Sequence, residues 1–479
     1  MTWRGPTAVL SAVAFLLLAV TPTALTTATA AATSPPTAVG SASQPPDVIV
    51  IMTDDQRGGT EQAMPYTSSY FGSQGVRYDR AVVPTNLCCP ARAAFLTGRY
   101  AHDTDVWENS GKFGGYRAFK QWQRQALPVE LQQAGYQTAL FGKYINHFND
   151  GGGRGSKPPG WDVFHTYDDP KLSGGYWTRV TGLPSGYTTD VLGTGVVNHI
   201  AEADPDKPLF VMYSPFAPHA NYDSGPYRSA ADDNLLARFR AAGEYGNPSM
   251  REKDVSDKPR WLRRLPRTRE RVLRATADNQ SRSLMGVDAN VRRIIQTQAA
   301  TRGLDNTMII YLSDNGYSWG DHRLRLKRHP YFLASRIPLW IKYPAGVVAG
   351  GGPGTVTSRL ANQLDVTATI AQLAGTGPVG EGKSLLGSVR ATLPLEASRS
   401  RGGMVNRPGF CGVRTKRYLY LHYTDGTIEL YDYRRDPYEL ENVFGDLRYQ
   451  WTPLRLELKL DPGCDLTQIA QMPGTDGGE

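Results

Sequence analysis

Unbroken apolar runs of strand length alternate with helix-like segments over most of the chain, and the first run covers residues 48–52. A strand is continuously apolar when helices cover both faces of its sheet, as in parallel sheets. The pattern therefore predicts an α/β region with a largely parallel sheet between helices. Similar runs occupy residues 138–141, 209–213, 308–312 and 339–341.

Helical patterns lie between these runs. Residues 127–134 begin with a proline in the first turn and are followed by Gly135, which is typical of a helix with a glycine at its C-terminal end. Residues 269–301 carry apolar side chains at helical spacing, and residues 362–374 are followed by Gly375. We expect these helices to cover the sheet.

The alternation of apolar runs and helical patterns gives way to another pattern after about residue 385. Residues 418–423 and 427–433 flank Asp425-Gly426, which is a strong β-hairpin signal. We therefore expect a large α/β domain at residues 47–385 and a small antiparallel β subdomain at residues 386–479. Cys411 and Cys464 both fall in the second part, where they form either a disulfide or two buried free thiols.

The N-terminal segment has the organisation of a secretory signal. Arg4 precedes an apolar stretch at residues 8–20, which ends in small residues through Ala32. The stretch is short for a membrane span, so we expect cleavage of residues 1–32, export, and no stable membrane insertion after signal cleavage. Residues 33–46 are rich in Ser, Thr and Pro and are expected to form a flexible lead-in.

Composition narrows the class of protein. The chain has 479 residues, of which 40% are hydrophobic and 20% charged, and its mean hydropathy is −0.41. These values exclude a coiled coil, a collagen and a polytopic membrane protein. The formal net charge of +8 points to an anionic partner. No nucleic-acid-binding motif is present, so a nucleic acid is not the expected partner.

Much of that charge is local, because residues 251–274 contain ten basic and four acidic side chains. One interpretation is a solvated surface, and the other is a rim that attracts a polyanionic substrate.

Polar side chains follow the apolar runs. Asp54 and Asp55 come directly after the first run, and Asp314 and Asn315 follow the run at residues 308–312. Ligands of parallel sheets gather at the carboxyl ends of the strands. Three carboxylates and an amide are hard oxygen ligands, which suit Ca²⁺ or Mg²⁺. Each pair is also an ordinary turn sequence, so the metal site remains one of two interpretations at this stage.

A third stretch of the sequence strengthens the interpretation of these residues as a metal site. Residues 87–99 read Leu-Cys-Cys-Pro-Ala-Arg-Ala-Ala-Phe-Leu-Thr-Gly-Arg. Pro90 belongs in the first turn of a helix, which puts Cys88 at the helix N-terminus, where an anion is favoured. Arg92 lies one turn further along the same face, from which it can hold a reactive group at position 88.

This string resembles the signature of the sulfatase family, C-x-P-x-R followed by T-G-R. Further stretches resemble members of the N-acetylglucosamine-6-sulfatase and arylsulfatase types, and the resemblance extends from about residue 47 to residue 443. It implies that residues 47–385 form an alkaline-phosphatase-like catalytic domain. In that family a formylglycine-generating enzyme oxidises the signature cysteine, here Cys88, to Cα-formylglycine, which is hydrated to a geminal diol. The matching stretches are residues 142–146, 158–161, 313–317, 320–327 and 430–439.

The resemblance also implies roles for individual residues. Lys143 and Lys327 would bind the sulfate oxygens, and His219 would donate a proton to the ester oxygen. Arg92 would offset the charge on the sulfuryl group, and His322 matches a further family position at which it is either functional or structural. The expected Ca²⁺ ligands, with Mg²⁺ the less favoured ion, are Asp54, Asp55, Cys88 in its modified form, Asp314 and Asn315.

Two positions depart from the family pattern. Many sulfatases have His two residues after the active-site lysine, where this chain has Ile145. His147 either replaces it in catalysis or is a surface residue. Ala91 stands where the signature often has Ser, which does not prevent modification if the enzyme reads the flanking residues.

The sequence thus predicts an exported sulfatase that hydrolyses sulfate esters of a sugar or an aryl alcohol. One hydroxyl of the diol at position 88 would attack sulfur, and loss of the proton from the second would expel sulfate and restore the aldehyde. One alternative is a phosphodiesterase or phosphonate monoester hydrolase of the same superfamily, which can share the signature. Another is a non-catalytic exported binding protein on the same fold.

Overall fold

The computed structural model describes residues 44–167, 180–219, 226, 229–241, 245–401, 405–472 and 475–476. The expected signal at residues 1–32 and the lead-in up to residue 43 lie outside these described residues. Residues 44–479 are grouped as one compact unit, and the expected division between residues 385 and 386 stays a prediction.

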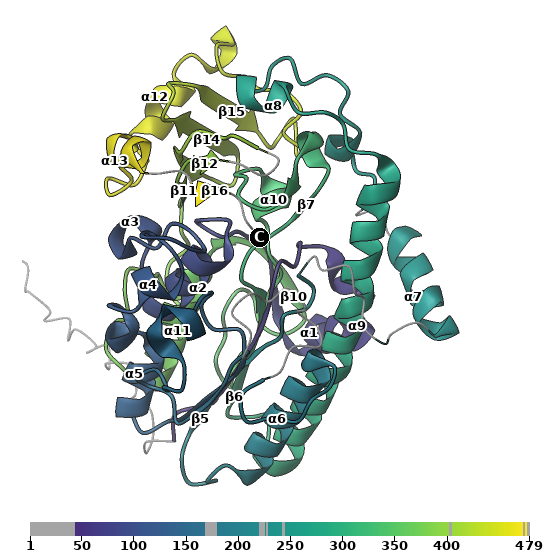
Figure 1. Ribbon diagram of the computed structural model, residues 1–479, viewed down its shortest axis with the longest axis vertical. Coiled ribbons are helices and arrows are strands. Elements are labelled where there is room, and N and C mark those ends of the chain that lie inside the picture. Colours follow the sequence, from purple (N-terminus) through teal and green to yellow (C-terminus); the bar gives the residue numbers. More distant parts are fainter. Residues whose placement is uncertain are drawn as a thin grey trace, which may run out of the picture. The chain divides into compact units, whose positions relative to one another are not determined.

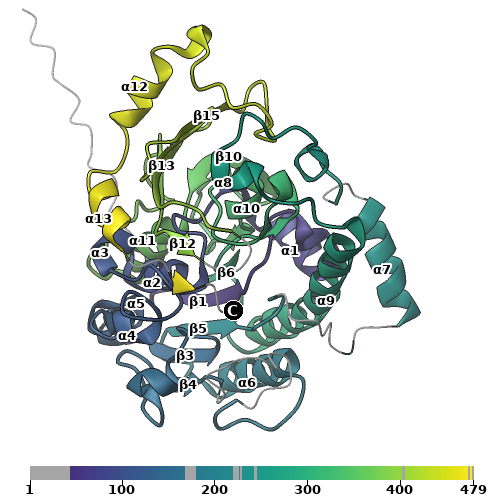
Figure 2. The same cartoon turned by 45° about the horizontal axis from the view of Figure 1, so that its top comes forward.

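A sheet of eight strands runs through the centre of this unit (Figures 1 and 2), in the order β10-β2-β9-β6-β1-β5-β3-β4. All neighbours are parallel except where β9 pairs with β2 and β6. The strands are β1 (Asp47–Thr53), β2 (Val76–Ala81), β3 (Gln137–Gly142), β4 (Val163–His165), β5 (Leu209–Ser214), β6 (Thr307–Ser313), β9 (Leu339–Lys342) and β10 (Thr355–Ala361).

Each of the five apolar runs in the sequence forms one of these strands, namely β1, β3, β5, β6 and β9. Strand β1 is buried over its whole length, because β5 and β6 pair with its two edges and helices cover both of its faces. The predicted α/β architecture with a mostly parallel sheet is therefore confirmed.

Helices cover the two faces of the sheet (Figure 1). Alternate residues of β1 face opposite sides: Val50 packs in a cluster with α2, α5 and α11, and Ile51 packs in another with α1, α6 and α9. The helices are α1 (Pro65–Gln74), α2 (Cys88–Thr97), α3 (Ala101–Thr104), α4 (Gly115–Phe119), α5 (Leu127–Gln133), α6 (Thr188–Glu202), α7 (Ala230–Ala241), α8 (Arg260–Arg263), α9 (Glu270–Thr301), α10 (Phe332–Ser335), α11 (Gln363–Ala374), α12 (Thr452–Glu457) and α13 (Leu466–Gln471).

The C-terminal part contains a separate antiparallel sheet in the order β11-β13-β14-β15. The hairpin predicted around Asp425-Gly426 joins β14 to β15, so this part of the prediction is confirmed. Cys411 and Cys464 form a disulfide, which settles the alternative that the sequence left open. The remaining strands are β7 (Ser318–Trp319), β8 (Arg325–Leu326), β11 (Leu393–Ala397), β12 (Ser400–Arg401), β13 (Phe410–Arg414), β14 (Tyr418–Tyr423), β15 (Ile428–Asp432) and β16 (Thr475–Asp476).

Among the described residues, no helix combines the length and the apolar character that crossing a membrane requires.

Candidate active site

The polar residues that follow β1 and β6 lie side by side, because the two strands are parallel neighbours in register. The backbone N–H of Asp314 donates to the carbonyl of Thr53 over 2.9 Å. The N–H of Asp55 donates to Oδ1 of Asp314 over 3.1 Å. Asp54, Asp55, Asp314 and Asn315 are therefore brought together at the carboxyl ends of the two strands, and all four are buried.

Helix α2 begins at Cys88, as the position of Pro90 predicted. The Cys88 side chain is buried, with Nζ of Lys327 2.9 Å and Oδ1 of Asp54 3.8 Å from its Sγ. Burial raises the pKa of the Cys88 thiol well above its ordinary value, although Lys143 and Lys327 oppose the shift. The side chain is therefore a thiol rather than a thiolate at neutral pH.

Each of the three carboxylates is paired with one cation. Lys143 Nζ lies 2.5 Å from Oδ2 of Asp54, and Lys327 Nζ lies 2.7 Å from Oδ1 of Asp55. Arg92 Nε lies 2.7 Å from Oδ2 of Asp314. These side chains are at most 3% exposed, so the attraction acts with little screening by solvent.

At Asp54 and Lys143, the neighbouring charges outweigh the effect of burial on the pKa. Burial alone would raise the pKa of Asp54, but Lys143, His219 and Arg92 hold it well below its ordinary value. Burial alone would lower the pKa of Lys143, and Asp54 raises it instead. Burial and the charge of Asp54 raise the pKa of Asp314, against the influence of Arg92.

Arg92 connects three strand ends. In addition to its ion pair with Asp314, its Nη1 donates to the carbonyl of Lys143 and to Oγ of Ser214, each over 2.8 Å. The hydrogen bonds of Arg92 thus go to the ends of β3, β5 and β6. Its contribution to position 88 is the positive charge it adds nearby.

The oxygen atoms of the cluster fit a hard divalent cation. One ligand atom from each of Asp54, Asp55 and Cys88 lies within 4.8 Å of the other two. Nδ2 of Asn315 donates to Oδ1 of Asp55 over 2.6 Å, which turns its Oδ1 away from that bond. This Oδ1 is buried and has no hydrogen-bond partner in the described part of the chain. An unpartnered carbonyl oxygen beside two carboxylates is a ready metal ligand.

His219 lies at the more exposed side of the cluster. Its Nε2 is 3.5 Å from Oδ2 of Asp55, and its ring stacks on Phe216 with 4.5 Å between the ring centres. The side chain is 16% exposed, whereas those of Lys143 and Lys327 are nearly inaccessible. Of these three side chains, His219 is therefore the most accessible to a ligand from solvent.

The two other candidate histidines do not contact the cluster within the described residues. His147 is 42% exposed, and its Nδ1 lies 3.0 Å from Oδ2 of Asp150. His322 is buried, and its Nδ1 lies 2.6 Å from Oε2 of Glu252.

Two residues that support the cluster were not predicted from the sequence. Ser214 ends β5 and accepts from Arg92, and the rule that polar residues matter at strand ends would have found it. Gln363 donates to the carbonyls of Ser313 and Asp314 over 3.1 and 2.6 Å. No local signal marks Gln363, because its role depends on how α11 packs beside β6.

A comparison of the sequence with models of known protein families identifies the family of the chain. A family model described as Sulfatase matches residues 46–376, which is more than half of the chain.

The chain belongs to the sulfatase family. The N-acetylglucosamine-6-O-sulfatase of Bacteroides thetaiotaomicron is 26% identical to this sulfatase over 462 residues, covering 79% of the chain and 78% of the relative. The N-acetylglucosamine-6-sulfatase of Capra hircus is 30% identical over 335 residues, which cover 65% of the chain and 56% of that protein. The family and its named sulfatases indicate sulfuric ester hydrolase activity.

One solved structure shows the same fold. It contains a protein in complex with its substrate D-glucosamine-2-N,6-O-disulfate, and it matches with a TM-score of 0.71 at 22% identity. The match covers 87% of this chain and 97% of that one. At this identity the likeness is evidence for the fold alone.

Proposed function

We propose that this sulfatase hydrolyses sulfate esters on a sugar, with a 6-sulfated glucosamine unit as the substrate class. The observation that carries the proposal is the position of Cys88, at the start of α2 and within reach of Lys327 and Asp54. The names of the bacterial and goat relatives support a glucosamine 6-sulfate as the class of ester.

Position 88 acts after modification. A thiolate is the reactive form of cysteine, and burial keeps the Cys88 side chain protonated, so the unmodified residue is a poor nucleophile. A formylglycine-generating enzyme converts Cys88 to Cα-formylglycine, whose hydrate supplies an oxygen nucleophile. The positive charges of Lys327 and Arg92 favour the deprotonated form of an oxygen at this position.

Ca²⁺ is the proposed metal. Asp54, Asp55, Asp314 and Asn315 would hold it together with residue 88. The closeness of ligand atoms from Asp54, Asp55 and Cys88 supports three of these ligands, and the unpartnered Oδ1 of Asn315 supports a fourth. A bound divalent cation supplies positive charge that lowers the pKa of an oxygen nucleophile and stabilises charge on the sulfuryl oxygens.

The cations of the cluster act on the charge of the ester: Lys143 and Lys327 bind its sulfate oxygens, and Arg92 adds positive charge. Lys143, Lys327 and Arg92 are fixed by their ion pairs before substrate arrives, so they need little reorganisation to stabilise charge that develops on the sulfuryl group. His219, at the exposed side of the cluster, donates a proton to the departing sugar oxygen.

The test compares three esters under identical conditions: N-acetylglucosamine 6-sulfate, p-nitrophenyl sulfate and the p-nitrophenyl ester of phenylphosphonate. We expect higher kcat/KM on both sulfates than on the phosphonate ester. A large preference for the phosphonate ester would instead make the protein a phosphonate monoester hydrolase. No turnover of any ester by fully modified, Ca²⁺-supplied protein would favour a binding protein.

The modification has its own test. Peptide mass spectrometry across residues 80–99 of protein from a host with the modifying enzyme should give a mass about 18 Da below that of the cysteine peptide, as expected when a thiol is oxidised to an aldehyde. An unshifted peptide from active protein would exclude the proposed nucleophile.

We also propose that the protein is exported from the cell. The disulfide between Cys411 and Cys464 supports an oxidising compartment. We expect protein recovered from the culture medium to begin after residue 32, as read by N-terminal sequencing. Retention of the intact N-terminus in the cytoplasm would contradict export.

A further inference from the structure

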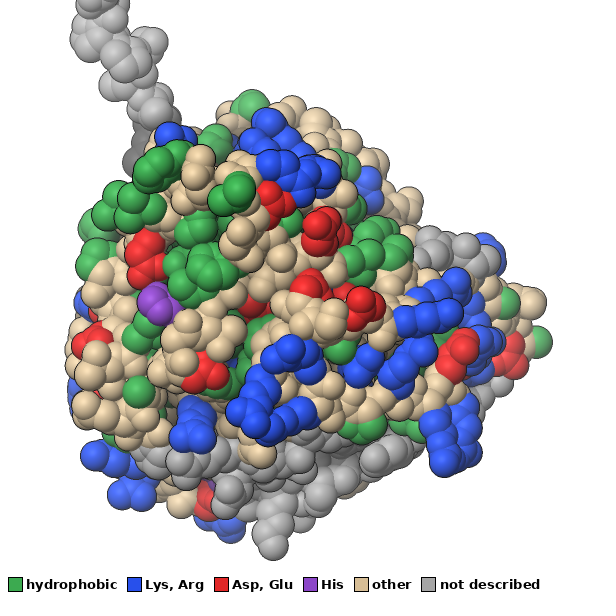
Figure 3. Space-filling model, turned by 90° about the horizontal axis from the view of Figure 1, so that it is seen from above, with side chains coloured by type: hydrophobic (Ala, Val, Ile, Leu, Met, Phe, Trp, Pro, Cys, Tyr) green, Lys and Arg blue, Asp and Glu red, His purple; other side chains and the backbone are tan. Residues whose placement is uncertain are grey.

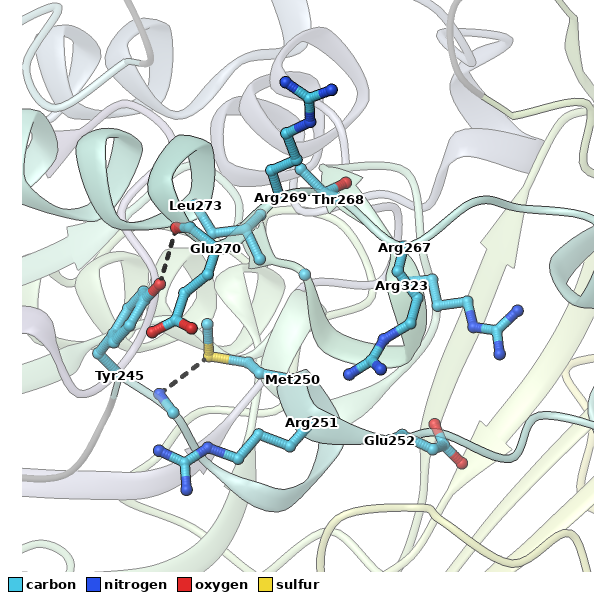
Figure 4. A pocket seen from close by; sticks show the side chains of 12 residues that line it. Tyr245, Met250, Arg251, Glu252, Arg267, Thr268, Arg269, Glu270, Leu273 and Arg323 are labelled. Atoms are coloured by element: carbon cyan, nitrogen blue, oxygen red, sulfur yellow. Dashed lines mark hydrogen bonds between the residues drawn. The ribbon is translucent and has the colours of Figure 1, made fainter.

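A pocket of about 370 Å³ lies outside the candidate active site (Figure 4). Three segments line it: residues 245–252, residues 267–273 at the start of α9, and the pair Gly320 and Arg323. Residues 251–273 belong to the basic segment, whose interpretation the sequence left open.

Arginines dominate the charge of this pocket. Arg251, Arg267, Arg269 and Arg323 line it. Figure 4 shows the side chains of Arg267 and Arg323 on one side of the pocket, whereas Arg269 directs its guanidinium away from them. Among the described residues, Arg251 and Arg267 have no acidic partner in an ion pair. Their charges are therefore available to an anion from solvent.

Arg323 is fixed in the wall of the pocket. Its Nη2 donates to the carbonyl of Lys253 over 2.8 Å, and its Nη1 donates to that of Leu265 over 3.3 Å. Its Nε is buried and lacks a hydrogen-bond partner in the described part of the chain. A guanidinium that two backbone carbonyls hold in place presents a fixed positive charge to an oxyanion.

The acidic residues of the pocket are already neutralised. Oε2 of Glu252 lies 2.6 Å from Nδ1 of His322, and its Oε1 lies 3.3 Å from Nζ of Lys258. Glu270 forms an ion pair of 3.0 Å with Arg274, one turn along α9. Neither acid is left to cancel the arginines, so the pocket has an excess of positive charge.

One segment of the chain connects the pocket with the active site. Gly320 and Arg323 lie in the loop that leads from Asn315 to Lys327. Arg323 precedes Lys327 by four residues, a span of at most about 14 Å between their Cα atoms. A substrate that contacts both residues therefore needs to span only about this distance.

We infer that the arginine pocket binds a second anionic group of the substrate, a sulfate or carboxylate on a sugar near the one that carries the reacting ester. This inference rests on the proposed function, because it identifies the substrate as a polyanionic oligosaccharide. Arg267 and Arg323 bind the oxyanion from one side of the pocket, and Arg251 adds charge from another. Figure 3 shows a face of the molecule with many Lys and Arg side chains in its right half. Such a concentration of positive charge attracts a polyanion.

The test uses the double variant Arg251→Gln/Arg267→Gln. Loss of two charged hydrogen-bond donors should raise KM for a tetrasaccharide that carries several sulfates by roughly tenfold. The KM for p-nitrophenyl sulfate, which has a single anionic group, should change by less than about twofold. The matched control is Arg264→Gln/Arg271→Gln, which removes the same charge from the same segment outside the pocket. Equal effects of the two double variants on the tetrasaccharide would overturn the inference.

Binding without turnover separates this inference from the proposed function. In a Cys88→Ala background, calorimetry with the tetrasaccharide should show the same tenfold weakening for Arg251→Gln/Arg267→Gln and little for the control. This result supports the pocket even if the wild-type protein fails to hydrolyse sulfate esters. Inorganic sulfate is the second probe. If it binds as tightly as the tetrasaccharide and with the same dependence on Arg267, the pocket takes a free anion and the inference is wrong.

Discussion

At the scale of single residues, the histidines differ in what they contact. His219 reaches Asp55 and is partly exposed, whereas His147 pairs with Asp150 at the surface. We predict that His219→Gln lowers kcat on a sugar sulfate by roughly 10²-fold, as for loss of a proton donor, and by much less on p-nitrophenyl sulfate. Nitrophenolate is a good leaving group that needs no proton, so the two substrates separate this role from a structural one.

His147→Gln is the matched control for that experiment. Since its side chain is exposed and pairs with Asp150 at the surface, we expect a change of less than about threefold on either ester. A loss with His147→Gln as large as with His219→Gln would show that His147 replaces the histidine that the family has at position 145.

Asn315 offers a test of the metal site. We predict that Asn315→Ala weakens Ca²⁺ binding at least tenfold in calorimetric titration of chelator-treated protein, because it removes the buried, unpartnered Oδ1. Asn306→Ala is the control, since Asn306 lies just before the opposite end of the same strand, β6. Equal Ca²⁺ affinities of the two variants would contradict the assignment.

Part of this site was predictable from single residues. Asp54, Asp314 and Cys88 follow local rules, because strand ends and a helix N-terminus are visible in the sequence. The pairing of each carboxylate with a particular cation was not predictable, because it depends on side-chain directions from segments far apart in the chain. Gln363 is the clearest example, since its amide supports Asp314 from a helix that begins nearly fifty residues later.

At the scale of secondary-structure elements, the C-terminal end of α2 leaves no space for a side chain on its last glycine. Gly98 ends α2 with φ 66°, and a Cβ on it would lie 2.3 Å from the carbonyl oxygen of Val379. Gly375 ends α11 with φ 71° and has no atom within 4 Å of such a Cβ. The two positions thus share the left-handed backbone and differ in the space available.

We predict that Gly375→Ala lowers the free energy of unfolding by about 1–2 kcal/mol, from backbone strain alone. Gly98→Ala should cost a further 1–3 kcal/mol or so, because the added methyl group also displaces the backbone at Val379. Guanidinium denaturation of both variants measures the difference. Equal losses would mean that the segment at Val379 moves without cost.

Three strands of the large sheet were not predicted: β2, β4 and β10. β2 contains Arg77, Asp79 and Arg80, β10 alternates between half-buried and exposed positions, and the short strand β4 is half-buried throughout. β2 and β10 lie toward one edge of the sheet, and β4 forms the other edge. The apolar-run criterion detects strands that are covered on both faces, so it finds the central strands and misses these three.

At the scale of the whole molecule, α3 meets the C-terminal part around His102. Burial alone would lower the pKa of His102, but its hydrogen bond to Glu396 and the nearby Asp103 and Asp461 raise it to about 9. Burial, together with Asp103, raises the pKa of Glu381 to about 7. Both values exceed those of the unfolded chain, so the folded state binds more protons across this range.

The stability that His102 and Glu381 contribute should therefore fall as the pH rises. The contribution of His102 is complete below about pH 6.5 and is lost as the pH passes through about 9. We predict that wild-type protein exceeds His102→Gln in free energy of unfolding at pH 6, and that the difference shrinks by pH 9.5. Denaturation at a series of pH values measures it. A difference that grows with pH would contradict this assignment.

The three buried ion pairs of the active site have a thermodynamic consequence. Asp54, Asp55 and Asp314 carry three negative charges, which Lys143, Lys327 and Arg92 balance in full. A divalent cation alone, or an anionic ester alone, leaves net charge in a site that solvent hardly screens, which is costly. Bound together, each offsets charge that the other brings. Metal and ester should therefore bind with positive cooperativity, and linkage requires each to tighten the other by the same factor.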